Sequence, residues 1–175
     1  MSLGTAEAYL DIETTGLSPF DCDITVIGIS LCDGEDMRFM QLVGEGITAE
    51  NILAALKGVG VIYTYNGSRF DFPFIRYHLQ INLEELFKHH DLMYDCWRCN
   101  LRGGFKAVEK QLGIKRELTE VDGYEAVRLW WRYVNDYDGD ALDTLLDYNR
   151  EDVLNLKALR ERLASGSLDF PYPLA

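Results

Sequence analysis

The first strand pattern in the chain is AEAYLDIETTG, residues 6–16, and the rest of the fold can be built outward from it. The apolar run Ala6–Glu13 predicts a buried strand, and Thr14–Gly16 begin a loop. Because side chains alternate along a strand, Asp11 and Glu13 leave the same face, roughly 6.6 Å apart along it. Alone, the pair would be interpreted as strand-end acids in water. A cation held between them is the alternative.

The next segments predict two more strands beside the first. Ile24–Leu31 is a β-branched run, and Asp33-Gly34 is a hairpin signal that leads into Met37–Val43. We therefore expect three antiparallel strands.

The remainder of the chain predicts a parallel extension of this sheet and then helices. Thr48 can cap a helix that runs to Lys57, and Val61–Tyr65 reads as a fourth strand, parallel to the first because of the helical crossover. Residues 71–80 are expected to be helical, and His89–Tyr94 to be a fifth strand. From about residue 96 onward the pattern is helical. The expected fold is a five-stranded mixed α/β sheet flanked by helices, with a helical C-terminal half.

Two late segments carry helical periodicity. One apolar face repeats at positions 0, 3, 4 and 7, and we interpret its tryptophans as core rather than as a base-stacking platform: Val127, Trp130, Trp131 and Val134. In the last helix an inward stripe consists of Leu145, Leu156, Leu159 and Leu163. Tyr148 and Asp152 fill the gap in that stripe, i and i+4, about 6 Å apart along the axis. A buried Asp paired with an Arg, beside a core Tyr, is the competing interpretation.

A fourth carboxylate, Asp71, follows the predicted fourth strand at a helix start, where a simple N-cap role competes. Asn66-Gly67 by itself indicates only a turn. If these acids converge, two unit charges about 4 Å apart repel by roughly 4 kcal/mol at an effective dielectric of 20, which favours a bound cation. Convergence would therefore indicate a metal enzyme.

The charge balance opposes a nucleic-acid partner. The chain has 29 acids against 17 Lys and Arg, a net charge of −12, and affinity for a polyanion normally comes from basic side chains. One segment is different, because six bases and only one acid, Glu109, lie within it: Arg98, Arg102, Lys106, Lys110, Lys115 and Arg116. A phosphate track and a solvated helix face are both compatible with it, and Gly103-Gly104 should break the helix. A basic partner protein or an appended domain would best explain the acidity.

Length and composition fit a single domain over residues 1–175, with 47% hydrophobic residues to fill one core. Met1–Gly4 could be an expression remnant. The chain has no apolar run long enough for a membrane span and its start lacks the regions of a signal peptide, so a cytoplasmic location is the default expectation.

The four cysteines are too scattered for a disulfide scaffold, and we expect reduced thiols: Cys22, Cys32, Cys96 and Cys99. A structural zinc site that uses them is the alternative, although only Cys96 and Cys99 form a close pair.

Three motifs together resemble a known family. DIETTG at 11–16, YNGSRFDFPF at 65–74 and YNREDV at 148–153 look like the motifs of the DEDD superfamily of 3′→5′ exonucleases, on a ribonuclease-H-like fold. The last motif resembles the tyrosine branch, DEDDy, since position 147 is Asp where the histidine branch has His. The middle motif is similar to that of proofreading domains in family B DNA polymerases. FKAVEKQLGIKR, VDGYEAV and YNREDV further resemble the YprB-like domains of bacteria and archaea.

The resemblance implies a role for each motif residue. Asp11 would bridge two divalent ions, Mg²⁺ or Mn²⁺, with Glu13 and Asp152 completing the first site and Asp71 holding the second largely through water. Tyr148 would orient the attacking water. An all-oxygen site also suits these ions better than Zn²⁺.

The implied substrate contacts surround the same place, and we expect them from Thr14, Leu17, Asn66, Phe70 and Lys106. The expected activity is hydrolysis of phosphodiester bonds from the 3′ end of single-stranded nucleic acid. The alternative is a weakly active or inactive nucleic-acid-binding or partner-docking domain that keeps the acids. No residue distinguishes DNA from RNA, which would require contacts to the 2′-OH.

Overall fold

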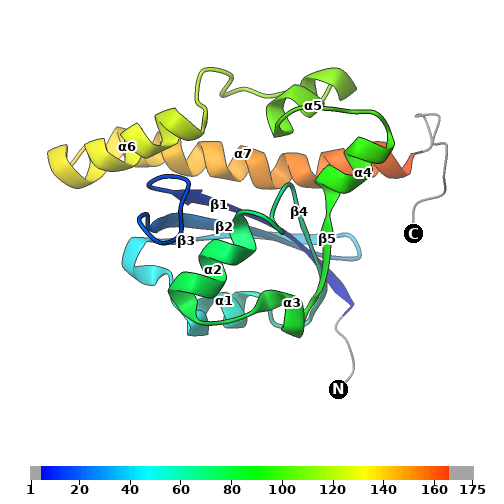
Figure 1. The fold of residues 1–175 in the computed structure, drawn as a ribbon, viewed down its shortest axis with the longest axis horizontal. Helices are drawn as coiled ribbons and strands as arrows, with labels where there is room; N and C mark the ends of the chain where they lie inside the picture. Colours follow the sequence, from blue (N-terminus) through cyan, green and yellow to red (C-terminus); the bar gives the residue numbers. More distant parts are fainter. Residues whose placement is uncertain (1–4, 166–175) are drawn as a thin grey trace.

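A computed structural model of the chain describes residues 5–165. Its core is one five-stranded sheet in the order β3-β2-β1-β4-β5 (Figure 1). The strands are β1 (Ala6–Thr14), β2 (Ile24–Asp33), β3 (Asp36–Val43), β4 (Val59–Thr64) and β5 (Lys88–Asp91). β1, β2 and β3 are antiparallel, and β4 and β5 run parallel to β1. The expected mixed sheet is confirmed.

Helices cover both faces of this sheet (Figure 1). On one face lie α1 (Ala49–Ala55), α2 (Asp71–Leu79) and α3 (Leu83–Leu86). On the other lie α4 (Leu92–Arg98), α5 (Phe105–Leu112), α6 (Gly123–Asp136) and the long α7 (Gly139–Ala164). A short 3-10 turn, η1 (Gly44–Gly46), follows β3. No helix in the described part is long and apolar enough to cross a bilayer.

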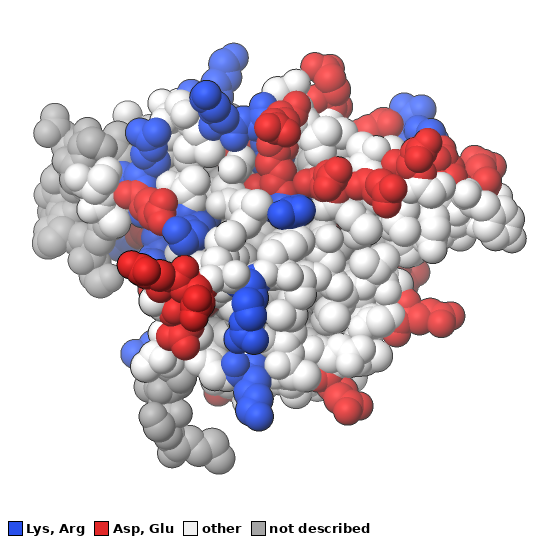
Figure 2. All heavy atoms as spheres, turned by 180° about the vertical axis from the view of Figure 1, so that it is seen from behind, with Lys and Arg blue, Asp and Glu red and all other residues white. Residues whose placement is uncertain are grey.

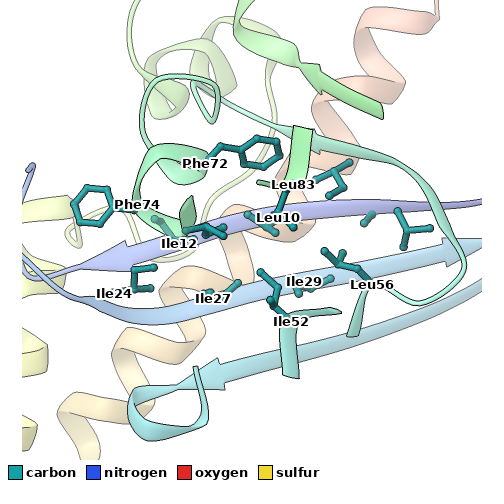
Figure 3. Packing of buried hydrophobic residues seen from close by; sticks show 14 of the residues in the cluster. Leu10, Ile12, Ile24, Ile27, Ile29, Ile52, Leu56, Phe72, Phe74 and Leu83 are labelled. Atoms are coloured by element: carbon teal, nitrogen blue, oxygen red, sulfur yellow. The ribbon is translucent and has the colours of Figure 1, made fainter. Parts of the chain in front are cut away.

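The alternation of side chains along β1 determines on which face of the sheet its acidic residues lie. Ala8, Leu10 and Ile12 pack with α1, α2 and α3 in the first hydrophobic core (Figure 3). The intervening residues face the other way: Tyr9 packs in the core beneath α7, and Asp11 accepts a hydrogen bond from α7. The period of two therefore places Asp11 and Glu13 under the last helix.

Several predicted boundaries need correction. The fourth strand spans Val59–Thr64 rather than Val61–Tyr65. The fifth strand ends at Asp91, not Tyr94, because the Asp91 carboxylate accepts a hydrogen bond from the Met93 N–H at 3.1 Å and starts α4. The first helix is capped by Thr48 as expected, through a 3.1 Å bond from the Asn51 N–H, but it ends at Ala55 rather than Lys57.

The tryptophan prediction for α6 is only partly right. The buried residues of α6 are Ala126 and Leu129, whereas Trp131 is 44% exposed and Val134 40% exposed. Trp130 is half-buried and packs against the hydrophobic cluster that contains Ala126 and Leu129. The reason is that α6 packs mainly on α7 and projects past the edge of the sheet, so its apolar stripe is only partly covered (Figure 1).

The glycine pair interrupts the basic segment as predicted. α4 ends at Arg98 and α5 begins at Phe105, with Gly103 at a φ of +112° between them. Such a backbone favours glycine. The four bases spaced by four therefore do not share one helix face. Met1–Gly4, considered above as an expression remnant, lie outside the described residues.

Candidate metal and active site

Three of the four candidate carboxylates meet in space. Asp11 and Glu13 from β1 and Asp152 from α7 each offer an oxygen within 4.8 Å of the others, and this is the only such group of His, Cys, Asp and Glu in residues 5–165. Glu13 and Asp152 are each only 7% exposed. Mutual repulsion at this separation amounts to several kcal/mol unless protons or a cation offset it.

The position of α7 brings Asp152 to this point. The predicted stripe is buried, and Tyr148 and Asp152 lie within it as expected. α7 can approach the sheet closely because β2 has Gly28 beneath it, where an added Cβ would lie 2.2 Å from the Asn149 Oδ1. Gly28 is paired with Asp11 on one side and Gln41 on the other.

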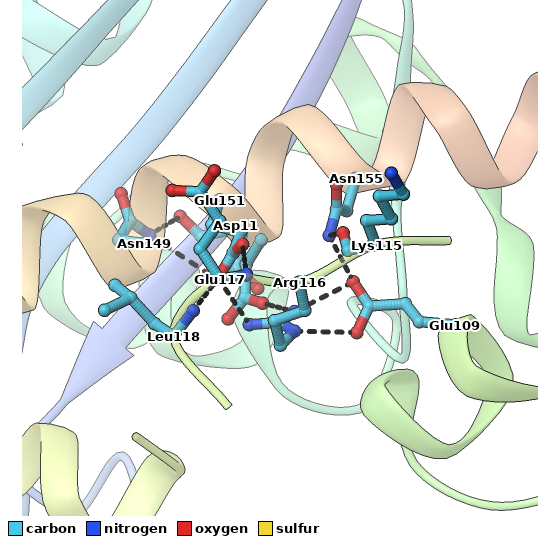
Figure 4. Close-up of polar contacts among 10 residues, drawn as sticks. Asp11, Glu109, Lys115, Arg116, Glu117, Leu118, Asn149, Glu151 and Asn155 are labelled. Atoms are coloured by element: carbon cyan, nitrogen blue, oxygen red, sulfur yellow. Dashed lines mark hydrogen bonds and ion pairs between the residues drawn. The ribbon is translucent and has the colours of Figure 1, made fainter. Parts of the chain in front are cut away.

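Asn149 fixes the orientation of Asp11. Its Nδ2 donates to Asp11 Oδ2 at 3.1 Å (Figure 4). Its Oδ1 accepts from Gln41 Nε2 at 3.0 Å. Asn149 is fully buried, so these bonds are protected from water. Sequence reasoning missed this residue, although its position beside Tyr148 in the motif could have indicated it.

The cluster raises the pKa values of its own members. Burial, followed by the charge of Asp152, raises the pKa of Asp11 and of Glu13 well above the ordinary range. Burial raises the pKa of Asp71 to about 7. Burial also raises the pKa of Asp152 to about 6, against the opposing charge of Arg116. Carboxyls in this state gain from a cation, which substitutes for the protons they otherwise retain.

Arg116 is the second residue that sequence reasoning missed. Its Nε and Nη2 donate to the two oxygens of Glu109, both at 2.9 Å, and Nη2 also pairs with Asp152. Figure 4 shows Arg116 between α5 and α7. The competing interpretation of a buried Asp paired with an Arg therefore describes Asp152 in this structure. The sequence held one indication of this buried ion pair, because Glu109 is the only acid in the basic segment. In the structure Glu109 is 1% exposed.

Asp71 lies near the cluster without joining it. It is buried and is the first residue of α2, whose N-cap is Phe70, so the N-cap alternative for Asp71 is wrong. Asp71 lines the same cavity as the three converging carboxylates. Asp71 is therefore a fourth carboxylate in the wall of this cavity, outside the group of three that converge.

A cavity of about 480 Å³ opens in front of these acids. Its walls include four of the five expected substrate contacts: Thr14, Leu17, Asn66 and Phe70. Tyr65, Tyr124 and Val127 also line it and were not anticipated. Leu17 is 88% exposed and Tyr124 77% exposed, so two large side chains that line the cavity are also open to solvent. A volume of this size is in the range of small-molecule sites.

Lys106 does not line the cavity, in contrast to the expectation. Its Nζ is buried, has no hydrogen-bond partner within residues 5–165, and lies 4.9 Å from the centre of the Tyr148 ring. Burial, followed by the charge of Arg116, lowers its pKa. Lys106 therefore lies against the face of the Tyr148 ring, in the geometry of a cation–π contact.

The cysteines do not form one ligand set. Cys22 packs against the core under α1, α2 and α3, whereas Cys32, Cys96 and Cys99 belong to the core on the opposite side of the sheet. All four are free thiols. This division gives the zinc alternative no support, and the carboxylate cluster, an all-oxygen donor set, fits Mg²⁺ or Mn²⁺.

The fold and the carboxylates shared between β1 and α7 define a ribonuclease-H-like domain with a nuclease-type acidic site. A family model described as RNase_H superfamily matches residues 8–164, and the chain belongs to this superfamily. The chain is 32% identical over 108 residues to the "Uncharacterized protein YprB" of Bacillus subtilis (strain 168), a match that covers 56% of this chain and 26% of YprB.

Solved structures agree on the fold. The family B DNA polymerase of the archaeon Pyrobaculum calidifontis superposes with a TM-score of 0.64 at 16% identity, over 90% of this chain and 24% of the polymerase. The apo form of a nuclease superposes with a TM-score of 0.59 at 22% identity, over 92% of this chain and 72% of that protein. The chain thus spans about a quarter of the length of YprB and of the polymerase.

Proposed function

We propose that this domain is a metal-dependent 3′→5′ exonuclease that acts on single-stranded nucleic acid by a two-metal-ion mechanism. The observation that carries the proposal is the convergence of Asp11, Glu13 and Asp152 at the floor of a cavity with apolar walls. The motif resemblance and the superfamily support it. We extend the proposal to the whole of residues 1–175 as one domain.

The carboxylates would hold the ions. Asp11, Glu13 and Asp152 would bind the first, and Asp71 would help to bind the second with Asp11. Bound divalent ions would supply a water of lowered pKa and stabilise the leaving oxygen. Arg116 holds Asp152 in place from behind, through its paired bonds to Glu109.

Tyr148 would orient the attacking water as a neutral phenol. Burial, together with the charges of Asp152 and Glu13, raises the pKa of Tyr148 far above neutrality, so its hydroxyl keeps its proton and can donate a hydrogen bond. Lys106 and Arg116 lie against the ring, at 4.9 and 5.7 Å from its centre, and keep it in this position.

The apolar walls suit a terminal nucleotide. Leu17 on the β1–β2 loop and Tyr124 at the start of α6 both line the cavity and are exposed, so a base could stack between them. Asn66 and Phe70 would contact the same nucleotide. Thr14 Oγ1 already donates to the Gly16 carbonyl at 2.6 Å, which leaves its backbone and hydroxyl oxygen for the substrate.

The test uses matched DNA and RNA strands labelled at either end, with Mn²⁺ at low salt. We expect mononucleotides from the 3′-labelled strand, a shortening ladder from the 5′-labelled strand, and no cleavage of a circular single strand. Mononucleotides from the 5′-labelled end, or cuts in the circle, would refute the proposed polarity.

One observation favours a second candidate, an inactive binding module. Arg116 already neutralises Asp152 without a metal, as a purely structural acid would be neutralised. This candidate predicts tight binding of the labelled strand in Mn²⁺ with no shortening at any enzyme concentration.

Tyr148→Phe should slow cleavage while leaving metal binding intact. Loss of the hydroxyl removes the donor that orients the water, and misplaced groups cost about a hundredfold in rate. We expect kcat to fall by about tenfold to a hundredfold, with the Mn²⁺ affinity measured by calorimetry unchanged. Tyr137→Phe, at a fully solvated tyrosine, is the control. Loss of Mn²⁺ binding in Tyr148→Phe would contradict the division of roles.

The metal-free protein should lose stability as the pH rises toward 8. The pKa values of Asp71 and Asp152 are about 7 and about 6 when folded, above the ordinary 3.8. A raised folded-state pKa stabilises the protein at low pH, and this contribution disappears as the pH passes the folded value. We expect Tm in EDTA to fall between about pH 5 and about pH 8.

His89 contributes in the opposite direction because burial lowers its pKa, so the comparison is made against Asp71→Asn, in which part of the decline should be absent. Mn²⁺ at a hundred times its Kd should add about 2.7 kcal/mol near pH 8. Identical pH profiles for the two proteins, or no effect of Mn²⁺, would count against the site.

A further inference from the structure

We propose that Arg69, Trp97 and Arg102 form a binding site for backbone phosphates of the strand that leads into the cavity. The inference rests on the proposed function and specifies where the substrate lies outside the active site. We call these three residues the arginine–tryptophan site.

The site joins three separate segments around one indole ring. Arg69 is in the β4–α2 loop, Trp97 in α4 and Arg102 in the α4–α5 loop. The guanidinium carbons of Arg69 and Arg102 lie 5.6 and 5.9 Å from the centre of the Trp97 ring. Tyr94 supports Trp97 edge-on at 5.4 Å. Stacking on the indole orders both arginines before a ligand arrives, which reduces the entropy lost on binding.

Neither arginine has an acidic partner among the described residues. Within residues 5–165 five other arginines form ion pairs: Arg98, Arg116, Arg128, Arg132 and Arg160. Arg69 and Arg102 form none there, as is also true of Arg38, Arg76, Arg150 and Arg162, and both are exposed. Their charge therefore remains free, and a guanidinium can donate two hydrogen bonds to one phosphate. What distinguishes Arg69 and Arg102 is that they share one indole ring.

The site adjoins the rim of the cavity. Tyr65 and Asn66 line the cavity, and Arg69 follows three residues later. Asp91 holds this loop by accepting from the Asn66 N–H at 2.8 Å and the Ser68 N–H at 3.1 Å. On the other side, the Tyr65 hydroxyl donates to the Gly103 carbonyl at 2.8 Å, directly beside Arg102. A strand whose terminal nucleotide occupies the cavity would pass over these residues.

The charge distribution favours a strand that leaves the cavity over the arginine–tryptophan site. The exposed acids of α6 and α7 include Asp136, Asp140, Asp143 and Asp147. Figure 2, which views the molecule from behind, shows red atoms in a row toward that end of the molecule, and blue and red atoms intermixed at the end where α5 and the end of α7 lie. A polyanion would be repelled from the α6 end and attracted toward α4 and α5.

The structure also revises the phosphate track expected from the basic segment. Arg98 is paired with Asp95, Arg116 with Glu109 and Asp152, and Lys106 is buried against Tyr148. Arg102 is the arginine of that segment left free within the described chain. Its counterpart, Arg69, lies outside the segment.

The test compares Arg69→Gln/Arg102→Gln with the matched double variant Arg38→Gln/Arg162→Gln. The control removes the same charge at exposed arginines without ion pairs among the described residues. Binding of a long labelled oligothymidylate is measured by anisotropy in Ca²⁺ over a salt series. Cleavage of a thymidine dinucleotide in Mn²⁺ is measured in parallel.

We expect the slope of log K against log salt to be shallower by about 1.4 in the test variant, since each single-strand phosphate contact contributes about 0.7. Dinucleotide cleavage should be unchanged, because so short a substrate does not reach the site. Trp97→Leu should weaken strand binding without a change in charge. Strand binding with an unaltered slope in the test variant would overturn this inference alone. Wild-type protein that neither binds nor cleaves would overturn the proposed function as well.

Discussion

Asp11→Asn should abolish metal-dependent cleavage and at the same time stabilise the metal-free protein. Asp11 is the carboxylate proposed to contact both ions, so its neutralisation removes several kcal/mol of transition-state stabilisation. Because each 1.36 kcal/mol of activation free energy changes the rate tenfold, we expect kcat/KM to fall by about a thousandfold or more. Without metal, the same change relieves repulsion from Asp152 and Glu13, which raise the pKa of Asp11 after burial does.

The gain in the free energy of unfolding should be about 0.5–2 kcal/mol, the usual range when a strained functional site is relaxed. It is measured by urea denaturation in EDTA near pH 8. The Asn side chain can still accept the bond from Asn149, so packing is preserved. Asp147→Asn, at an exposed acid on the outer face of α7, makes the same chemical change and should alter neither activity nor stability. An inactive but destabilised Asp11→Asn would show that the acid is structural.

Gly28→Ala should destabilise the fold and weaken metal binding together. A Cβ at this position would lie 2.2 Å from Asn149 Oδ1 and 2.8 Å from Val153 Cγ2, so α7 must move away from β2. Overpacking of this kind costs about 1–3 kcal/mol, or a fall in Tm of about 2–4 °C per kcal/mol at this chain length. The displaced helix carries Asn149 and Asp152, so Mn²⁺ affinity should fall as well.

The matched control is Gly139→Ala, in the first turn of α7, where nothing lies within 4 Å of the added Cβ. It should leave the stability unchanged or raise it by up to about 1 kcal/mol. Gly28→Ala/Asn149→Ala should recover part of the lost stability but not the metal affinity. Wild-type stability in Gly28→Ala would show that α7 does not depend on this close approach.

Much of the fold and half of the site follow from periodicity. Alternation along β1 places Asp11 and Glu13 on one face, and the helical stripe of α7 turns Tyr148 and Asp152 inward; both are local properties of the chain. The same reasoning was wrong for Trp131, because periodicity identifies an apolar face but not the extent to which another element covers it. It was also wrong for the end of β5, where Asp91 starts a helix.

The partners of these residues could not be predicted from the sequence. Arg116 is 36 residues from Asp152, and Asn149 is 138 residues from Asp11. Such contacts depend on how closely α7 packs on β2, which Gly28 permits, and on the loop that carries Arg116 back to the site. Lys106 was expected beside the substrate and instead packs on Tyr148.

The amino-acid sequence alone determined the number and directions of the strands, through the hairpin signal and the helical crossover. It also determined the face that carries the acids and the inward positions on the last helix, because side-chain direction repeats with the backbone. The tertiary structure determined which charges meet: a converging carboxylate cluster, a buried arginine beside it, and two exposed arginines that stack on one indole. Electrostatic interactions depend on distance through space and on burial, and neither is a property of residue spacing along the chain.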